Sequence, residues 1–146
     1  ECGWSKSRGK INRFLFRLVN KVQPATVIEV GQPSTASLYL QSAKPSASYL
    51  FASDLSELFL DADTPVDFLY MNNYQNPELI EEVFHICAQR VTLKSVVQGI
   101  CYSKKMKTLW NQLKEDERVG VTFDLYDLGL FFFDKTKIKQ HYIVNF

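Results

Sequence analysis

Two kinds of hydrophobic pattern alternate along the chain. Short, mostly apolar runs are typical of strands buried in a sheet, and longer segments with apolar residues every three or four positions are typical of helices. The expected strands are residues 26–31, 48–52, 66–71, 90–97, 119–125, 128–133 and 142–144. The expected helices are residues 11–21, 35–43, 77–87 and 104–115, with at most a short helix at 55–60.

Residues at the ends of these segments support the same boundaries. Ser34 or Thr35 can cap the second helix, because a hydroxyl accepts hydrogen bonds from backbone N–H groups that are unpaired at a helix start. Pro77 stands where the first turn of a helix accepts proline. A tight turn separates residues 119–125 from residues 128–133, which predicts a β-hairpin.

The order of these elements predicts a single α/β domain over residues 1–146. Strands that alternate with helices form mainly parallel sheets covered on both faces, and the terminal hairpin adds an antiparallel strand. We therefore expect a three-layer α/β/α domain in which an N-terminal helical segment, residues 1–23, packs on the sheet. A chain of 146 residues is long enough to bury a real core.

Composition and charge narrow the function. The chain is 46% hydrophobic and 14% aromatic, as expected for a globular protein. Its net charge of +1 offers no electrostatic basis for binding nucleic acid or an anionic membrane. No apolar run approaches the roughly 20 residues that a membrane helix needs.

The cysteines and the N-terminus bear on location. Cys2, Cys87 and Cys101 are odd in number and widely spaced, which predicts free thiols in a reducing cytoplasm. The start of the sequence has no secretory signal pattern. Because the chain begins with Glu1 rather than Met, we expect it to be trimmed or part of a longer protein.

Candidate chemistry gathers where the first expected strand ends. In open α/β sheets ligands bind at the carboxyl ends of the strands, and Gly31 lets the backbone turn sharply or approach a ligand closely there. Glu29 precedes this glycine on the same strand. His85 and His141 have no partners at metal-ligand spacing, so we expect no metal site.

Several stretches of the chain resemble a known family. Residues 14–20, 27–31, 38–40, 124–130 and 139–146 resemble class I S-adenosylmethionine-dependent methyltransferases, most closely a group common in Bacteroidetes. The resemblance covers most of the chain and implies a Rossmann-like methyltransferase fold with S-adenosylmethionine as the cofactor. By position in the family's motifs, it implies cofactor-binding roles for Glu29, Gly31, Ser53, Asp54 and Asn72.

The sequence departs from the family's pattern at several positions. The loop after Gly31 lacks the family's second glycine. Ser53 replaces the acid that holds the ribose hydroxyls, with Asp54 beside it. Asn72 replaces an acid that works on substrate or metal, and the end of the next strand has Gln98 and a glycine in place of paired acids.

These departures favour a protein that has lost catalysis. Residues 55–64 are too few for the family's next strand and helix, so the sheet is expected to be one strand short. We interpret the chain as a catalytically degenerate methyltransferase-like protein that acts as a binding or interaction module. It has no assigned catalytic residue, and it has S-adenosylmethionine as its cofactor only if the altered site still holds it.

The alternative is an active methyltransferase with an atypical cofactor site. Glu29, Gly31 and Asp54 would then hold the cofactor. Asp54, Asp67 and Tyr70 are candidates for the general base, by proximity to strand ends alone.

An exposed sheet edge invites pairing with another chain. If one strand is lost, the strand at residues 48–52, with Tyr49 and Phe51, becomes such an edge. We therefore expect a homodimer formed there or through the aromatic C-terminal strands. Neither a membrane nor a nucleic acid is expected as a partner.

Overall fold

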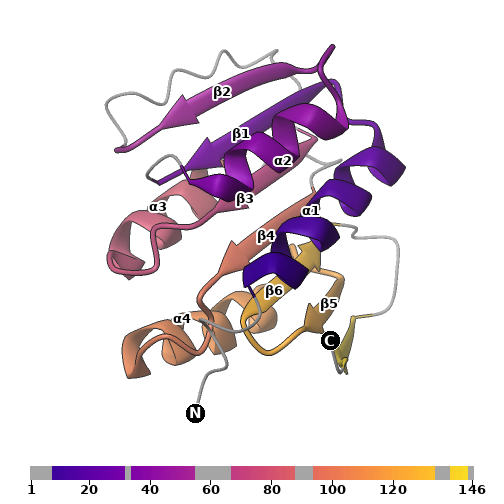
Figure 1. Cartoon of the computed structure of the whole chain (residues 1–146). Coiled ribbons are helices and arrows are strands. Elements are labelled where there is room, and N and C mark those ends of the chain that lie inside the picture. Colours follow the sequence, from indigo (N-terminus) through magenta and orange to yellow (C-terminus); the bar gives the residue numbers. More distant parts are fainter. Residues whose placement is uncertain (1–7, 32–33, 55–66, 88–93, 134–138, 145–146) are drawn as a thin grey trace.

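The computed structural model describes residues 8–31, 34–54, 67–87, 94–133 and 139–144. In these residues a single sheet carries helices on both faces (Figure 1). The helices are α1 (Arg8–Val22), α2 (Thr35–Ala43), α3 (Pro77–Cys87) and α4 (Lys104–Glu115). The strands are β1 (Thr26–Val30), β2 (Ser48–Ala52), β3 (Phe68–Met71), β4 (Lys94–Gln98), β5 (Val121–Asp124), β6 (Leu128–Phe132) and β7 (Gln140–Ile143).

The described strands form one mixed sheet in the order β2-β1-β3-β4-β6-β5-β7. β2, β1, β3 and β4 pair in parallel, β6 pairs antiparallel with both β4 and β5, and β7 pairs in parallel with β5. The predicted fold, a mainly parallel three-layer sheet with an antiparallel hairpin, is confirmed. β2 is the outermost described strand on its side. Residues 55–64 lie outside the described residues, so the expectation that the sheet is one strand short stays a prediction.

The predicted bounds are close to those observed. β2 and α2 begin and end where the pattern placed them. β3 begins at Phe68, β4 is described from Lys94 to Gln98, and β7 begins at Gln140 rather than at Tyr142. Residues 66 and 90–93, which were also predicted as strand, lie outside the described residues. The short helix expected at residues 55–60 lies outside the described residues.

Asp67 joins the beginnings of β1 and β3. Its two carboxylate oxygens accept hydrogen bonds from the backbone N–H groups of Ala25 (2.7 Å) and Thr26 (2.8 Å). Hydrogen bonds to an ionised carboxylate are stronger than neutral ones, so this pair fixes the start of β1. Asp67 therefore lies at the amino ends of the parallel strands, opposite to the end where ligands bind, and this position removes the geometric basis for a role as general base.

The two faces of the sheet bury separate hydrophobic cores. α1 and α2 cover one core, to which Val27, Phe68 and Tyr70 contribute from the strands. α3 and α4 cover the other core, to which Ile28 and Leu69 contribute. Successive residues of a strand point to opposite faces, so successive residues of these strands enter the two cores alternately and are mostly apolar. This is why the parallel strands read as continuous apolar runs.

Two observations bear on the expected environment of the protein. None of the helices in the described residues is long and apolar enough to cross a membrane. Cys101 is disulfide-bonded, so the expectation of free thiols is wrong for this residue. Because disulfides persist chiefly in oxidising compartments, the cysteines give no support to a cytoplasmic location, which stays a prediction.

Candidate functional site

A buried carboxylate lies at the centre of the predicted site. Glu29 of β1 is 0% exposed, and its Oε2 accepts a hydrogen bond from Ser37 Oγ of α2 (2.6 Å). Its Oε1 accepts a hydrogen bond from the Tyr49 hydroxyl of β2. Asn72 Nδ2, directly after β3, also donates to Oε2 (3.4 Å). Three segments around β1 thus supply donors to one carboxylate, and we call these four residues the Glu29 cluster.

The first turn of α2 is built onto this cluster. Ser34 is the N-cap residue, and its backbone N–H donates to Ser37 Oγ (3.1 Å). The backbone N–H of Ser37 donates to the Ser34 carbonyl (3.0 Å). Ser37 Oγ therefore accepts a hydrogen bond at the start of the helix and donates one to Glu29, which ties α2 to the end of β1.

The side chains that donate hydrogen bonds to Glu29 in this cluster are all neutral. No ion pair between described residues includes Glu29. Burial raises the pKa of Glu29 above its ordinary value of 4.5, and the hydrogen bonds from Ser37 and Tyr49 offset this only in part. Burial, together with the nearby Glu29 charge, also raises the pKa of the Tyr49 and Tyr70 hydroxyls. Neither phenol ionises readily, so Tyr70 is not suited to act as a general base.

Asn72 fills the space in front of Gly31. Gly31 has a φ of +133°, a backbone conformation that residues with side chains rarely adopt. A Cβ on Gly31 would lie 1.6 Å from Asn72 Oδ1 and 2.8 Å from Asn72 Cγ. The close approach that a glycine permits is used here by a side chain of the same chain.

Backbone hydrogen bonds hold this arrangement in place. The Gly31 N–H donates to the Ala52 carbonyl at the end of β2 (2.9 Å). The Asn72 N–H donates to the Val30 carbonyl at the end of β1 (2.9 Å). The parallel ladder thus continues one residue past each strand and brings Gly31 and Asn72 together.

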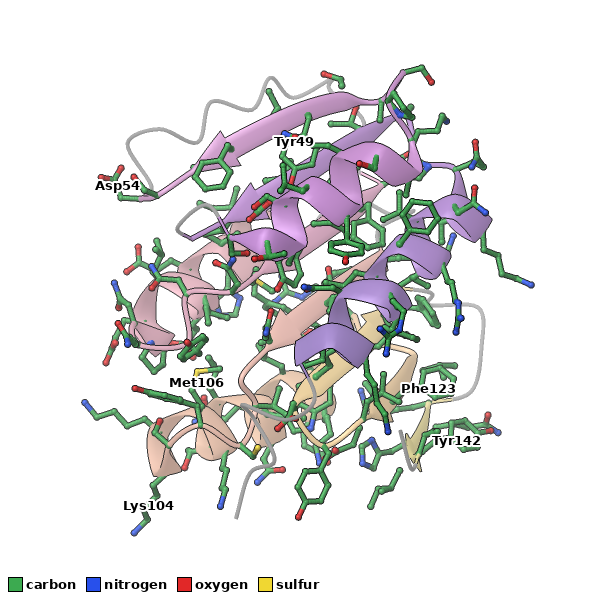
Figure 2. The ribbon with its side chains drawn as sticks, viewed as in Figure 1. Tyr49, Asp54, Lys104, Met106, Phe123 and Tyr142 are labelled. Carbon is green, nitrogen blue, oxygen red and sulfur yellow. The ribbon has the colours of Figure 1, made fainter. Side chains whose placement is uncertain are left out.

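The two residues predicted at the ribose position follow β2. Ser53 is half-buried and Asp54 is exposed. Figure 2 shows Asp54 beyond the end of β2, apart from Tyr49, the second residue of that strand. The structure therefore brings Gly31 into contact with the Glu29 cluster, whereas Asp54 lies outside it.

Aromatic side chains cover the end of β4, where the resemblance places paired acids. Gln98 is buried, and Gly99 has a φ of +79°. A Cβ on Gly99 would lie 2.6 Å from Tyr74 Cβ, so the Tyr74 side chain packs directly on this glycine. The Tyr74 and Tyr102 rings lie 4.4 Å apart between centroids. The glycine at this position thus allows an aromatic side chain, rather than a ligand, to approach the backbone.

Ser37 and Tyr49 belong to the site although the sequence did not single them out. Ser37 follows Ser34 at the spacing of a capping box, and this spacing could have predicted that Ser37 lies at the start of α2. Tyr49 offers no such signal, because its proximity to Glu29 depends on the register of β1 against β2. Among the described residues, no group of three or more His, Cys, Asp or Glu side chains could hold a metal ion.

No protein-family model and no curated protein matches the sequence. Solved structures share the fold. The O-methyltransferase TomG from Streptomyces achromogenes, involved in tomaymycin synthesis and solved in complex with SAM, has a TM-score of 0.67 at 14% identity, over 86% of this chain and 80% of its own. Cofactor-bound Rv0187 from MTB has a TM-score of 0.65 at 12% identity, over 85% of this chain and 79% of its own. The O-methyltransferase from Bacillus cereus in complex with SAH has a TM-score of 0.60 at 12% identity, over 84% and 80%.

Proposed function

We propose that this chain, which has the Rossmann-like fold of methyltransferases, is a degenerate form of that fold that does not catalyse and acts as a binding or interaction module. One observation carries the proposal. At the strand end where Gly31 would admit a ligand, Asn72 fills the space and donates to the buried Glu29 carboxylate. The site is thus occupied by the chain's own side chains.

S-adenosylmethionine does not fit this arrangement of residues. A ligand group that approaches the Gly31 backbone meets the Asn72 side chain, in the position where a Cβ would lie 1.6 Å from Oδ1. Both oxygens of Glu29 already accept hydrogen bonds inside the Glu29 cluster. A cofactor would have to displace these donors, and each buried donor left without an acceptor costs about 1–3 kcal/mol.

The strand ends also argue against proton transfer from a methyl acceptor. Asn72 directly follows β3, and Gln98 is the last residue of β4. Both side chains are amides, and an amide cannot act as a general base. Of the three candidates for the base, Asp67 lies at the opposite end of the strands and Tyr70 is buried with a raised pKa. Asp54 follows β2 at the ligand-binding end, but it lies outside the Glu29 cluster.

Calorimetric titration of S-adenosylmethionine and S-adenosylhomocysteine into the protein tests the proposal. We expect no heat of binding at millimolar ligand, with cooperative thermal unfolding as evidence that the sample is folded. Micromolar binding that is lost in Glu29→Ala would overturn the proposal and support an active methyltransferase with an atypical cofactor site.

A pair of asparagine variants tests whether the filled space is the cause. Asn72→Ala removes the side chain in front of Gly31, and we expect it to gain weak cofactor binding. Asn73→Ala makes the same chemical change at the next residue and serves as the matched control. Equal behaviour of the two variants would mean that Asn72 does not control access to Gly31.

A further inference from the structure

A pocket lies on the opposite face of the sheet from the Glu29 cluster. The pocket lies between α4 and the turn that joins β5 and β6. Its volume is about 470 Å³, a size typical of small-molecule sites. Its walls include Lys107, Trp110 and Asn111 of α4, with Asp124 and Tyr126 at the turn. β3, β4 and β6 separate β1 from β5, so this pocket is independent of the corner around Gly31.

Polar groups of both charges line this pocket. Lys107 and Asn111 lie one helical turn apart, and neither side chain makes a hydrogen bond or an ion pair with another described residue. Asp124 uses only Oδ1, which accepts the Tyr126 N–H (2.9 Å), so its Oδ2 is available to a ligand. A cation, an amide and a carboxylate oxygen from two elements therefore converge on one concave surface.

The turn that carries Tyr126 has a strained backbone. Tyr126 has a φ of +76°, in the left-handed region that residues with a Cβ rarely adopt. Besides the Asp124 bond, the Leu125 N–H donates to the Leu128 carbonyl (2.8 Å) and the Asp127 N–H donates to the Leu125 carbonyl (3.0 Å). Strain of this kind is concentrated at functional sites. Here it keeps an aromatic ring that is 61% exposed at the rim of the pocket.

Trp110 forms the inner wall. Its side chain is 4% exposed, and its six-membered ring packs on Gly129, where a Cβ would lie 2.5 Å from Cη2. The indole N–H is buried and has no acceptor among the described residues. A ligand that brings an acceptor to this wall would pair with an indole N–H that no described residue satisfies.

We propose that this pocket binds a small zwitterion with an aromatic ring, of the class of the aromatic amino acids. The ligand carboxylate lies toward Lys107 and Asn111, and the ligand ammonium lies toward Oδ2 of Asp124. The ring lies between Trp110 and Tyr126. The proposal does not depend on whether the corner around Gly31 binds a cofactor.

Three probes that share the phenyl ring and differ in which charged groups they carry test the proposal. L-phenylalanine is the zwitterion, phenethylamine keeps only the cation, and 3-phenylpropionate keeps only the anion. Each is titrated while the indole N–H signal of Trp110 is followed by nitrogen–proton NMR. Trp4 and Trp110 are the two tryptophans, and Trp110→Phe identifies the signal. We expect L-phenylalanine to move this signal saturably, with the other two probes at least about tenfold weaker.

Two variants and a matched control complete the test. Lys107→Gln and Asp124→Asn each remove one charge, and Asp124→Asn keeps the oxygen that accepts the Tyr126 N–H; we expect each to weaken L-phenylalanine binding about tenfold. Lys105→Gln removes a charge from the same helix at a residue that lies near Glu78 of α3 (4.0 Å), and we expect no change. The proposal is wrong if no probe shifts the Trp110 signal at millimolar concentration, if all three bind equally, or if both pocket variants bind like the wild type.

Discussion

Oδ1 of Asn72 lies 1.6 Å from the position that a methyl group on Gly31 would occupy. Asn72 is held there because its Nδ2 donates to the buried Glu29 and its N–H donates to the Val30 carbonyl. The methyltransferases that the sequence resembles carry an acidic residue at the position of Asn72. Its replacement by an amide gives a neutral group that can donate to Glu29, whereas a second ionised carboxylate beside Glu29 would repel it.

Gly31→Ala should therefore destabilise the fold. The new Cβ would meet the Asn72 side chain, and the φ of +133° is strained for alanine whatever the space. We expect the free energy of unfolding, measured with urea, to fall by more than about 2 kcal/mol. The added change Asn72→Ala should recover only the part of this loss that is due to the contact.

Gly9→Ala is the matched control for this substitution. Gly9 lies in α1, where a Cβ would make only an ordinary contact with Arg13 Nη1 at 3.7 Å. Alanine is preferred to glycine inside a helix by about 0.5–1 kcal/mol, so this variant should be slightly more stable than the wild type. A Gly31→Ala protein as stable as the wild type would contradict the packing of Asn72 on Gly31.

Ionisation of Glu29 should make the protein less stable as the pH rises. The pKa of Glu29 is raised in the folded state, so the folded protein holds this proton more tightly than the unfolded chain does. The contribution to stability is complete below pH 4.5 and is lost as the pH rises through the raised pKa. Glu29→Gln cannot ionise, so wild-type stability should fall relative to that of this variant between pH 4.5 and neutral.

Urea unfolding at a series of pH values measures this difference. Glu115→Gln, which removes an exposed carboxylate from α4, is the matched control. A difference between the wild type and Glu29→Gln that stays constant with pH would mean that Glu29 is not a desolvated carboxylate.

The hydrophobic pattern was sufficient to predict the fold because the spacing of apolar residues reflects local geometry, which differs between a helix and a strand. Apolar runs such as residues 26–30 are continuous because their residues serve two cores, and the start of α2 was readable from Ser34. β3 was predicted to begin too early for a non-local reason. Asp67 bonds to Ala25 and Thr26, and no local pattern records that contact.

The site could be predicted where its residues are close in sequence or directly follow neighbouring parallel strands. Glu29 and Gly31 share one strand end, and the position of Asn72 after a parallel strand placed it near them. Tyr49 reaches Glu29 only because β1 and β2 pair Val27 with Tyr49, and this register is set by packing. The disulfide at Cys101 and the pocket at α4 are tertiary features of the same kind.

Asp116 should lose its stabilising role in acid. Its Oδ2 lies 2.8 Å from Arg118 Nη2, and its Oδ1 accepts hydrogen bonds from Arg118 Nε and from the Arg118 N–H (both 2.9 Å). These bonds, with the guanidinium charge, lower the pKa of Asp116 to about 2. Because this pKa is depressed in the folded state, the contribution is complete above pH 3.8 and is lost as the pH falls through about 2.

Asp116→Asn should cost about 0.5–1 kcal/mol at neutral pH, the range for an ion pair that water still screens in part. The difference from the wild type should shrink as the pH falls through about 2. Urea or thermal unfolding across this range measures it. A cost that persists unchanged in acid would come from packing of the side chain and not from its charge.

A second copy of the chain should pair with β7. We propose this edge, of the two that the sequence suggested, because all four residues of β7 are exposed whereas β2 is half-buried over most of its length. Ile143 is 77% exposed, and Tyr142 stacks on Phe123 with 5.3 Å between ring centroids (Figure 2). An exposed apolar edge strand offers unpaired N–H and C=O groups to a partner.

Sedimentation velocity at micromolar concentration tests this pairing. We expect a dimer for the wild type and a monomer for Ile143→Lys, because a charged side chain on an edge strand opposes pairing. Tyr49→Lys would disturb the Glu29 cluster, so Ser48→Lys, at the exposed start of β2, is the matched variant for the other edge. A dimer that resists Ile143→Lys but dissociates in Ser48→Lys would place the interface at β2, and a wild-type monomer would exclude both edges at this concentration.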